Sequence, residues 1–278
     1  MFEARIQTVA GTVPVSSVEG PVLPWETLRA DTRWGVGVES DPERWLDEEG
    51  HVTAELTRLN REFGLSLIVD HTGLGMGRDT TALTRMAAGS RVAIVAATGF
   101  GPEPFAGELI RKSGVDDLTG DLLREIGVGL DGTSARPGLI VATAHDETPT
   151  PAEERATVAA ARASLRTDLP IAASGLALLE TLLHHRVPPQ RVNVRTADPL
   201  AQRKICETGA YVTVTCPDDV FTLLDAGHGE RVLFTSGVSR RDELCPYGGE
   251  GYAKLFDVEG VPDLVTRVNP VRWLAGGR

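Results

Sequence analysis

Histidine and acidic side chains directly follow two of the strand-like segments of this sequence. His71 comes after an apolar run that ends at Asp70, and His145 comes after a second such run. An imidazole titrates near physiological pH, so His71 and His145 are the best candidates for a general acid or base. Asp70 is the third catalytic candidate, although neighbours at a strand end point apart and need not form a dyad. The alternative interpretation is that each histidine caps or packs a loop.

Polar residues at the ends of the other strand-like runs are candidates for substrate binding. Arginine can hold a carboxylate or phosphate through two hydrogen bonds, although surface pairing with Asp198 or Asp242 is an equally good interpretation. Arg195 adjoins Thr196, which we expect to face inward, so alternation turns Arg195 outward unless the strand has already ended. A cysteine can act as a nucleophile beside a histidine, but a lone cysteine is more often inert. The predicted binding residues are Ser16, Thr98, Ser174, Arg195, Thr196, Cys216, Ser236 and Arg240.

Short apolar, β-branched runs alternate with longer stretches of helical spacing. Continuous apolar strands between helices are typical of a parallel sheet covered on both faces. Eight such units predict an α/β fold, a (β/α)₈ TIM barrel over residues 1–278 as a single domain, whose active site lies at the C-terminal ends of the strands. The clearest helices are Thr150–Thr167 and Gly175–His185. The predicted strands are Thr12–Val18, Leu65–Asp70, Val92–Ala97, Gly138–Ala142, Pro170–Ala173, Arg191–Val194, Tyr211–Thr215 and Arg231–Thr235.

Composition restricts the class of protein. Hydrophobic residues make up 41% and charged residues 24%, which is ordinary for a globular protein. The net charge of −11 argues against a nucleic-acid partner, because phosphate binding requires a basic surface. The 3 cysteines form no CxxC pair, so neither a zinc knuckle nor a disulfide framework is indicated. There is no apolar run long enough for a membrane span and no signal peptide at the start, so we expect a cytoplasmic location without membrane contact.

A glycine-rich segment, His71–Asp79, follows a predicted strand and invites a comparison with dinucleotide-binding loops. Its glycines lie at positions 73, 75 and 77, whereas the fingerprint requires G-x-G-x-x-G. The next strand also ends without the acidic residue that would hold a ribose. We therefore interpret the segment as a tight loop on the barrel rim.

Several segments together resemble the phosphotriesterase-like family of the amidohydrolase superfamily. Residues 62–79, VAIVAATGF at 92–100 and LLREIGVGLDGTSARPGLIVA at 122–142 are similar to the second, third and fourth β/α units of that family. AAARASLRTDLPIAAS at 159–174 continues the similarity, and RVNPVRWL at 267–274 resembles the family's closing segment. The resemblance implies a barrel with two divalent metals at its mouth, which activate a water molecule. It also makes a homodimer a possibility to test.

The resemblance implies metal ligands at six positions that this sequence does not retain. The family holds its metals with an H-x-H on strand 1, a carboxylated lysine on strand 4, single histidines on strands 5 and 6 and an aspartate on strand 8. Aliphatic, hydroxyl and glycine positions supply no imidazole, thiolate or carboxylate donor. The corresponding positions are expected to be Val18, Gly20, Val141, Ser174, Thr196 and Gly237. We therefore expect no metal and no other cofactor.

Three functional interpretations follow from this loss. The first is a metal-independent hydrolase, lyase or cyclase that acts on a small organic molecule at the barrel mouth, with a histidine or aspartate as the acid–base group. The second is a non-catalytic barrel that binds a small ligand or a protein partner. The third is an ordinary metal-dependent ester or lactone hydrolase. A minor alternative places a new single-metal site at His145 with Asp146, Glu147, Asp218 and Asp219.

Overall fold

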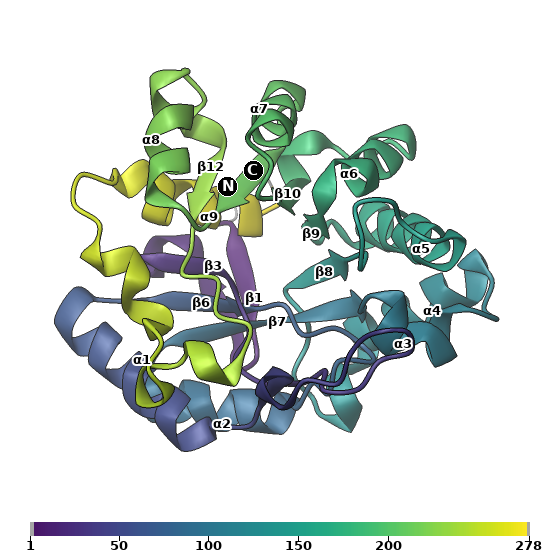
Figure 1. Ribbon diagram of the computed structural model, residues 1–278, viewed down its shortest axis with the longest axis horizontal. Coiled ribbons are helices and arrows are strands. Elements are labelled where there is room, and N and C mark those ends of the chain that lie inside the picture. Colours follow the sequence, from purple (N-terminus) through teal and green to yellow (C-terminus); the bar gives the residue numbers. More distant parts are fainter. Residues whose placement is uncertain (1–2, 277–278) are drawn as a thin grey trace.

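Eight parallel strands form the centre of the molecule, and helices surround them (Figure 1). The computed structural model describes residues 3–276. Each strand pairs with the next one along the chain, in the order of a (β/α)₈ barrel, so the predicted fold class is confirmed. The barrel strands are β3 (Val22–Glu26), β6 (Leu67–Asp70), β7 (Ala93–Phe100), β8 (Leu139–Ala142), β9 (Ile171–Ser174), β10 (Val192–Arg195), β11 (Tyr211–Val214) and β12 (Val232–Phe234).

Helices connect the successive strands and form the outer layer. In α5, Thr150 accepts a hydrogen bond from the backbone N–H of Glu153, Pro151 occupies the first turn, and Asp168 ends the helix in a left-handed conformation. These local signals made α5 predictable to within one residue. The helices are α1 (Glu49–Phe63), α2 (Thr80–Ser90), α3 (Glu103–Ile110), α4 (Val115–Val128), α5 (Pro151–Thr167), α6 (Gly175–His184), α7 (Pro199–Thr208), α8 (Pro217–Asp225) and α9 (Asn269–Leu274).

Two apolar layers hold the barrel together. Along β6, Ile68 packs outward in the layer between strands and helices, whereas Leu67 and Val69 belong to the layer inside the barrel. The same alternation applies to the other strands, because successive side chains of a strand point to opposite faces. Burial of apolar surface on both faces explains the continuous hydrophobic runs in the sequence.

The N-terminal end of the barrel is covered by two elements that are not part of its wall. A hairpin of β1 (Arg5–Thr8) and β2 (Gly11–Pro14) places Ile6 in the interior layer, and α9 contributes Trp273 to the same layer. A second two-stranded sheet, β4 (Ala30–Asp31) with β5 (Trp45–Leu46), follows the first barrel strand.

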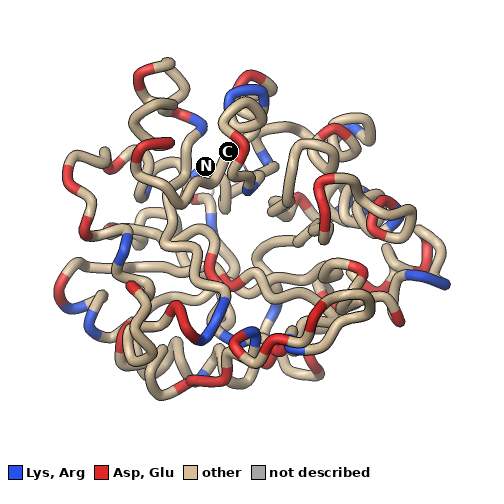
Figure 2. The backbone as a smooth tube through the Cα atoms, viewed as in Figure 1, with Lys and Arg blue, Asp and Glu red and all other residues tan. Residues whose placement is uncertain are grey.

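Acidic residues outnumber basic ones by 39 to 28. Figure 2 shows the acidic residues spread over the helices and loops.

The first predicted strand was wrong. Residues 12–18 form part of β2 and the 3-10 turn Val15–Ser17, and the first barrel strand is β3. β3 contains Pro24, which lacks a backbone donor, and its pairing with β6 shifts register between Leu23 and Glu26. A proline within a short run argues against a strand when only the sequence is read, so the β-branched residues of the hairpin gave the stronger signal.

The glycine-rich segment forms a tight loop between β6 and α2. Gly75 and Gly77 adopt φ values of 89° and 74°, and a Cβ atom at Gly77 would lie 2.7 Å from the backbone nitrogen of Asp31. Glycine is required at both positions because backbone atoms of other segments lie too close for a Cβ atom.

Within residues 3–276, no helix is long and apolar enough to cross a bilayer.

Candidate active site at the barrel mouth

The first and last barrel strands are joined by a buried carboxylate at the mouth. Glu26, at the end of β3, accepts hydrogen bonds from Thr235 Oγ1 (2.6 Å) and from the backbone N–H groups of Ser236, Gly237 and Val238 (2.6–2.9 Å). Burial raises the pKa of Glu26 to about 7, against the lowering effect of these donors. The side chain of Glu26 therefore closes the barrel, a role that the sequence analysis missed.

His71 lies at the mouth end of β6, two residues beyond the inward Val69. Its ring stacks on Trp25 of β3, with centroids 4.1 Å apart and an interplanar angle of 12°. His71 Nδ1 lies 3.3 Å from the carbonyl oxygen of Val69, and Nε2 is buried without a hydrogen-bond partner among the described residues. Burial lowers the pKa of His71 to about 3, and the charge of Arg195 adds to the lowering. The ring is therefore neutral at physiological pH, with Nδ1 as the donor and Nε2 as a free acceptor.

Among the described residues, no hydrogen bond joins Asp70 to His71, which agrees with the expectation that neighbours at a strand end point apart. Asp70 Oδ1 accepts a hydrogen bond from the backbone N–H of Leu28 at 2.7 Å, and Oδ2 accepts one from the N–H of Thr72 at 3.2 Å. Burial raises the pKa of Asp70 to about 6. These hydrogen bonds hold the loops after β3 and β6 together. The carboxyl group of Asp70 therefore stabilises the fold.

The predicted orientations of Arg195 and Thr196 were reversed. Val192 and Val194 pack in the outer layer, so Asn193 and Arg195 occupy the inner face of β10, which continues to Arg195. Thr196 lies beyond the strand, where its hydroxyl accepts a hydrogen bond from the N–H of Asp198. The buried polar Asn193 between two valines was the signal in the sequence that could have revealed the inner face.

The guanidinium of Arg195 lies beside strand-end residues of β11 and β12. A Cβ atom at Gly237 would lie 3.1 Å from Arg195 Nη2 and 2.6 Å from Thr215 Cγ2. Gly237 also has a φ of 78°, which disfavours any larger residue. Burial lowers the pKa of Arg195, and the charges of Glu26 and Glu243 oppose the lowering. No hydrogen bond or ion pair joins this guanidinium to another residue within 3–276.

Three of the predicted positions lie at the wrong end of the barrel. Val18, Ser16 and Gly20 precede β3, and Val18 packs in the interior layer near the covering hairpin. Ser16 is exposed there and lines a cavity with Arg272 of α9. Because the mouth lies at the opposite ends of the strands, the strand 1 pair of the family must be sought at the end of β3, where Trp25 and Thr27 flank Glu26.

Thr98 was also wrongly placed in the mouth. Its hydroxyl donates a 2.6 Å hydrogen bond to Glu125 of α4, so the side chain points outward from β7. Glu125 and Asp131 in turn bind Arg78 of the glycine-rich loop at 2.5 and 2.6 Å. The side chain of Arg78 is only 2% exposed. Thr98 therefore belongs to a structural ion cluster between the sheet and the helices.

The remaining predicted site residues are either engaged in local hydrogen bonds or exposed. Ser174 Oγ accepts a hydrogen bond from the N–H of Ala144, and Ser236 Oγ donates to the carbonyl oxygen of Tyr252. Cys216 is exposed and precedes the first turn of α8. His145 is exposed and lines a separate cavity of about 260 Å³ beside Glu103. None of these side chains contacts His71 or Arg195 through a hydrogen bond within residues 3–276.

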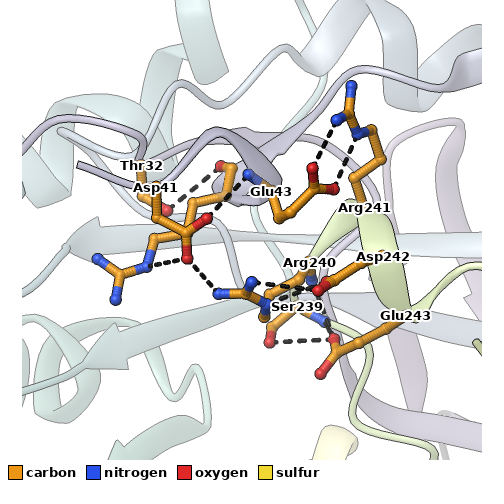
Figure 3. A network of polar contacts seen from close by, with 9 residues as sticks. Thr32, Asp41, Glu43, Ser239, Arg240, Arg241, Asp242 and Glu243 are labelled. Atoms are coloured by element: carbon orange, nitrogen blue, oxygen red, sulfur yellow. Dashed lines mark hydrogen bonds and ion pairs between the residues drawn. The ribbon is translucent and has the colours of Figure 1, made fainter. Parts of the chain in front are cut away.

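A strap of ion pairs joins the segment after β4 to the segment after β12 at the rim (Figure 3). Arg240 pairs with Asp41 at 2.5 Å and with Asp242 at 3.0 Å, and Arg241 pairs with Glu43 at 2.7 Å. We call these five residues the rim strap. The pairing of Arg240 with Asp242 shows that this arginine is neutralised locally.

Comparisons with known proteins agree with this architecture. The sequence model of the Phosphotriesterase family matches residues 4–186. The Phosphotriesterase homology protein of Escherichia coli (strain K12) is 28% identical over 260 residues, covering 85% of this chain and 88% of the relative. The human N-acetyltaurine hydrolase is 22% identical over 294 residues, with 83% and 82% covered.

Two solved structures show the same fold. The Escherichia coli homology protein, complexed with phosphate in its active site, superposes with a TM-score of 0.84 at 25% identity, over 92% of this chain and 99% of that chain. A resiniferatoxin-binding protein from Rhodobacter sphaeroides superposes with a TM-score of 0.86 at 25% identity, over 98% and 95% of the two chains. The chain is thus a phosphotriesterase-like barrel and belongs to the Phosphotriesterase family.

Proposed function

We propose that this barrel binds a small organic molecule at its mouth and acts on it without the two divalent metals of the family. The observation that carries the proposal is Arg195, which stands on the inner face of β10 next to Thr196, the position at which the resemblance implies a metal-binding histidine. A permanent cation at this position would repel a divalent ion. The neighbouring position in the segment after β12 is Gly237, which has no side chain to donate.

The chemistry of the other strand-end residues supports the same proposal. Trp25, Thr27, Val141 and Ser174 provide no imidazole, thiolate or carboxylate, the donors that zinc and manganese require. Within the described range 3–276, no group of three or more His, Cys, Asp or Glu side chains is arranged to hold a metal. The residues present therefore do not fit the metal pair of the family, and the proposal uses no step through a metal.

His71 and Arg195 supply complementary chemistry for such a site. In an ester or lactone hydrolysis, His71 Nε2 would accept a proton from water as the water oxygen attacks the carbonyl carbon. The electron pair of the C=O bond would move to its oxygen, where Arg195 stabilises the negative charge. Collapse of the intermediate would break the C–O bond, and the proton would pass to the leaving oxygen. Because Asp70 is engaged in loop hydrogen bonds, the acid–base role falls to His71.

A second candidate function, ligand binding without turnover, is favoured by the pKa of His71. A base with a pKa of about 3 has a small driving force for accepting a proton at neutral pH. In that case, Nε2 would accept a hydrogen bond from the ligand, and Trp25 would fix the ring. We also propose that the protein forms a homodimer and is located in the cytoplasm.

The test combines metal analysis with turnover by variants. Purified protein is expected to contain far less than one equivalent of divalent ion, and EDTA is expected to leave any activity on a panel of lactones, esters and N-acyl amino acids unchanged. His71→Gln should abolish turnover, whereas His145→Gln, the matched control, should not. Two tightly held metal equivalents, with activity lost on chelation and restored by Zn²⁺, would overturn the proposal. Ligand binding without turnover would select the second candidate.

A further inference from the structure

Arg195 is a half-buried cation at the barrel mouth without a counter-ion among residues 3–276. Charged side chains that leave water are nearly always paired, because desolvation of an unpaired charge is costly. Arg195 is half-buried, yet no carboxylate lies within ion-pair distance of it among residues 3–276. An unneutralised guanidinium at a mouth where substrates bind indicates that the missing counter-ion comes from a ligand.

The two nearest acids are committed to other bonds. Both oxygens of Glu26 accept hydrogen bonds from the segment 235–238. Glu243 Oε2 accepts from the backbone N–H groups of Ser239 and Arg240, at 2.6 and 3.0 Å. Their charges act on Arg195 from a distance and leave its hydrogen-bond donors free.

A second polar group on the same face lacks an acceptor. Asn193 Oδ1 accepts a 2.8 Å hydrogen bond from Thr213 Oγ1, so Nδ2 points away from that hydroxyl. Asn193 Nδ2 is then left fully buried without a partner, two residues before Arg195 on the inner face of β10. Among the described residues, His71 Nε2 is a further buried polar atom near the mouth end without a hydrogen-bond partner. β10 therefore presents two sets of N–H donors that no protein acceptor satisfies.

We infer that the mouth recognises an organic carboxylate, with Arg195 as its anchor and Asn193 as the donor beneath it. The inference rests on the proposed binding function and adds the class of ligand. A guanidinium binds a carboxylate through two parallel hydrogen bonds, which matches one fixed cation with free donors. Because the negative charges of Glu26 and Glu243 already act on Arg195, a singly charged carboxylate is favoured over a doubly charged phosphate.

The experiment compares carboxylates with their uncharged analogues. Acetate, hexanoate and benzoate are each titrated in parallel with the corresponding primary amide. Inorganic phosphate is titrated as well. Binding is measured by calorimetry and by the NMR shifts of arginine Nε–H groups. At least one carboxylate should bind more tightly than its amide and shift the signal of Arg195. Arg195→Gln should weaken that carboxylate about 10- to 100-fold, as expected for a hydrogen bond to a charged group. Arg203→Gln, on the exposed face of α7, should leave the affinity unchanged.

A stability measurement separates a binding role from a structural one. Without ligand, Arg195→Gln should keep or raise the melting temperature, because it removes an unpaired charge; a structural arginine would give a decrease. The inference would be overturned if carboxylates bound no more tightly than their amides, or if they bound Arg195→Gln as tightly as the wild type. Tighter binding of phosphate than of any carboxylate at Arg195 would also overturn it. Carboxylate binding without metal or turnover would uphold the ligand class and reject catalysis, so the two proposals fail separately.

Discussion

Arg78 and Arg195 are both withdrawn from water beside the same sheet, but their surroundings differ. Arg78 lies outside the barrel, where two carboxylates and the carbonyl oxygen of Ala97 satisfy its guanidinium. Arg195 lies at the mouth beside Gly237, and no carboxylate forms an ion pair with it within the described chain. Within the described residues, the fold thus neutralises the cation that holds helices to strands and leaves the cation at the mouth without a counter-ion. This difference is the basis of our proposal that Arg78 has a structural role and that Arg195 binds a ligand.

Arg78→Gln should have the largest effect on stability. The substitution leaves Glu125 and Asp131 without their cation, and breaking a buried ion pair in this way costs about 3–5 kcal/mol. Urea denaturation measures the loss. Arg124→Gln, which removes an exposed partner of Asp121 on the same helix, is the matched control and should change little. If both variants have equal stability, the proposed structural role of Arg78 is incorrect.

Glu26→Gln should change how stability depends on pH. The folded pKa of Glu26 is about 7, above the ordinary value of 4.5, so the folded state holds this proton more tightly. The associated stability is complete below pH 4.5 and is lost as the pH rises through 7, by about 3 kcal/mol in total. The difference in unfolding free energy between wild type and Glu26→Gln should therefore vary over this range. Parallel pH curves for the two proteins would contradict the assignment.

His71→Gln should act in the opposite pH direction. The folded pKa of His71 is about 3, below the ordinary 6.5, so the unfolded chain takes up this proton first. The wild type should lose about 2 kcal/mol from this group as the pH falls from 6.5 to 5, and the variant should not. Chemical denaturation at the two pH values tests this. A histidine NMR signal of His71 that titrates above pH 5 would refute the buried neutral ring.

The rim strap should give the smallest effect. Its side chains are partly exposed, and such pairs are weakened by salt. Arg241→Ala and Glu43→Ala, alone and together, should leave the midpoint of global unfolding almost unchanged. Hydrogen exchange of residues 32–46 should become faster, and added salt should produce the same change in the wild type. Global destabilisation comparable to that of Arg78→Gln would show that the strap is part of the structural core.

Most of the wall of the barrel could be predicted from the sequence, because each strand and helix carries a local pattern. Pro151 and the acidic residues of the first turn, with the helix-forming residues that follow, located α5, and β-branched runs located seven of the strands to within a few residues. The first strand was missed because Pro24 interrupts it. The candidate site was predicted less well, since a one-residue error at the end of β10 exchanges the inward and outward faces.

The sequence by itself determined the fold, the family resemblance and the identity of the residues at the strand ends, because these depend on patterns of neighbours. Only the tertiary structure decided that Glu26 joins strands 210 residues apart, that Thr98 points away from the mouth and that Arg195 points into it without a counter-ion. Such contacts depend on strand register and on which side chains meet across the barrel. Those relations are set by packing of the whole chain.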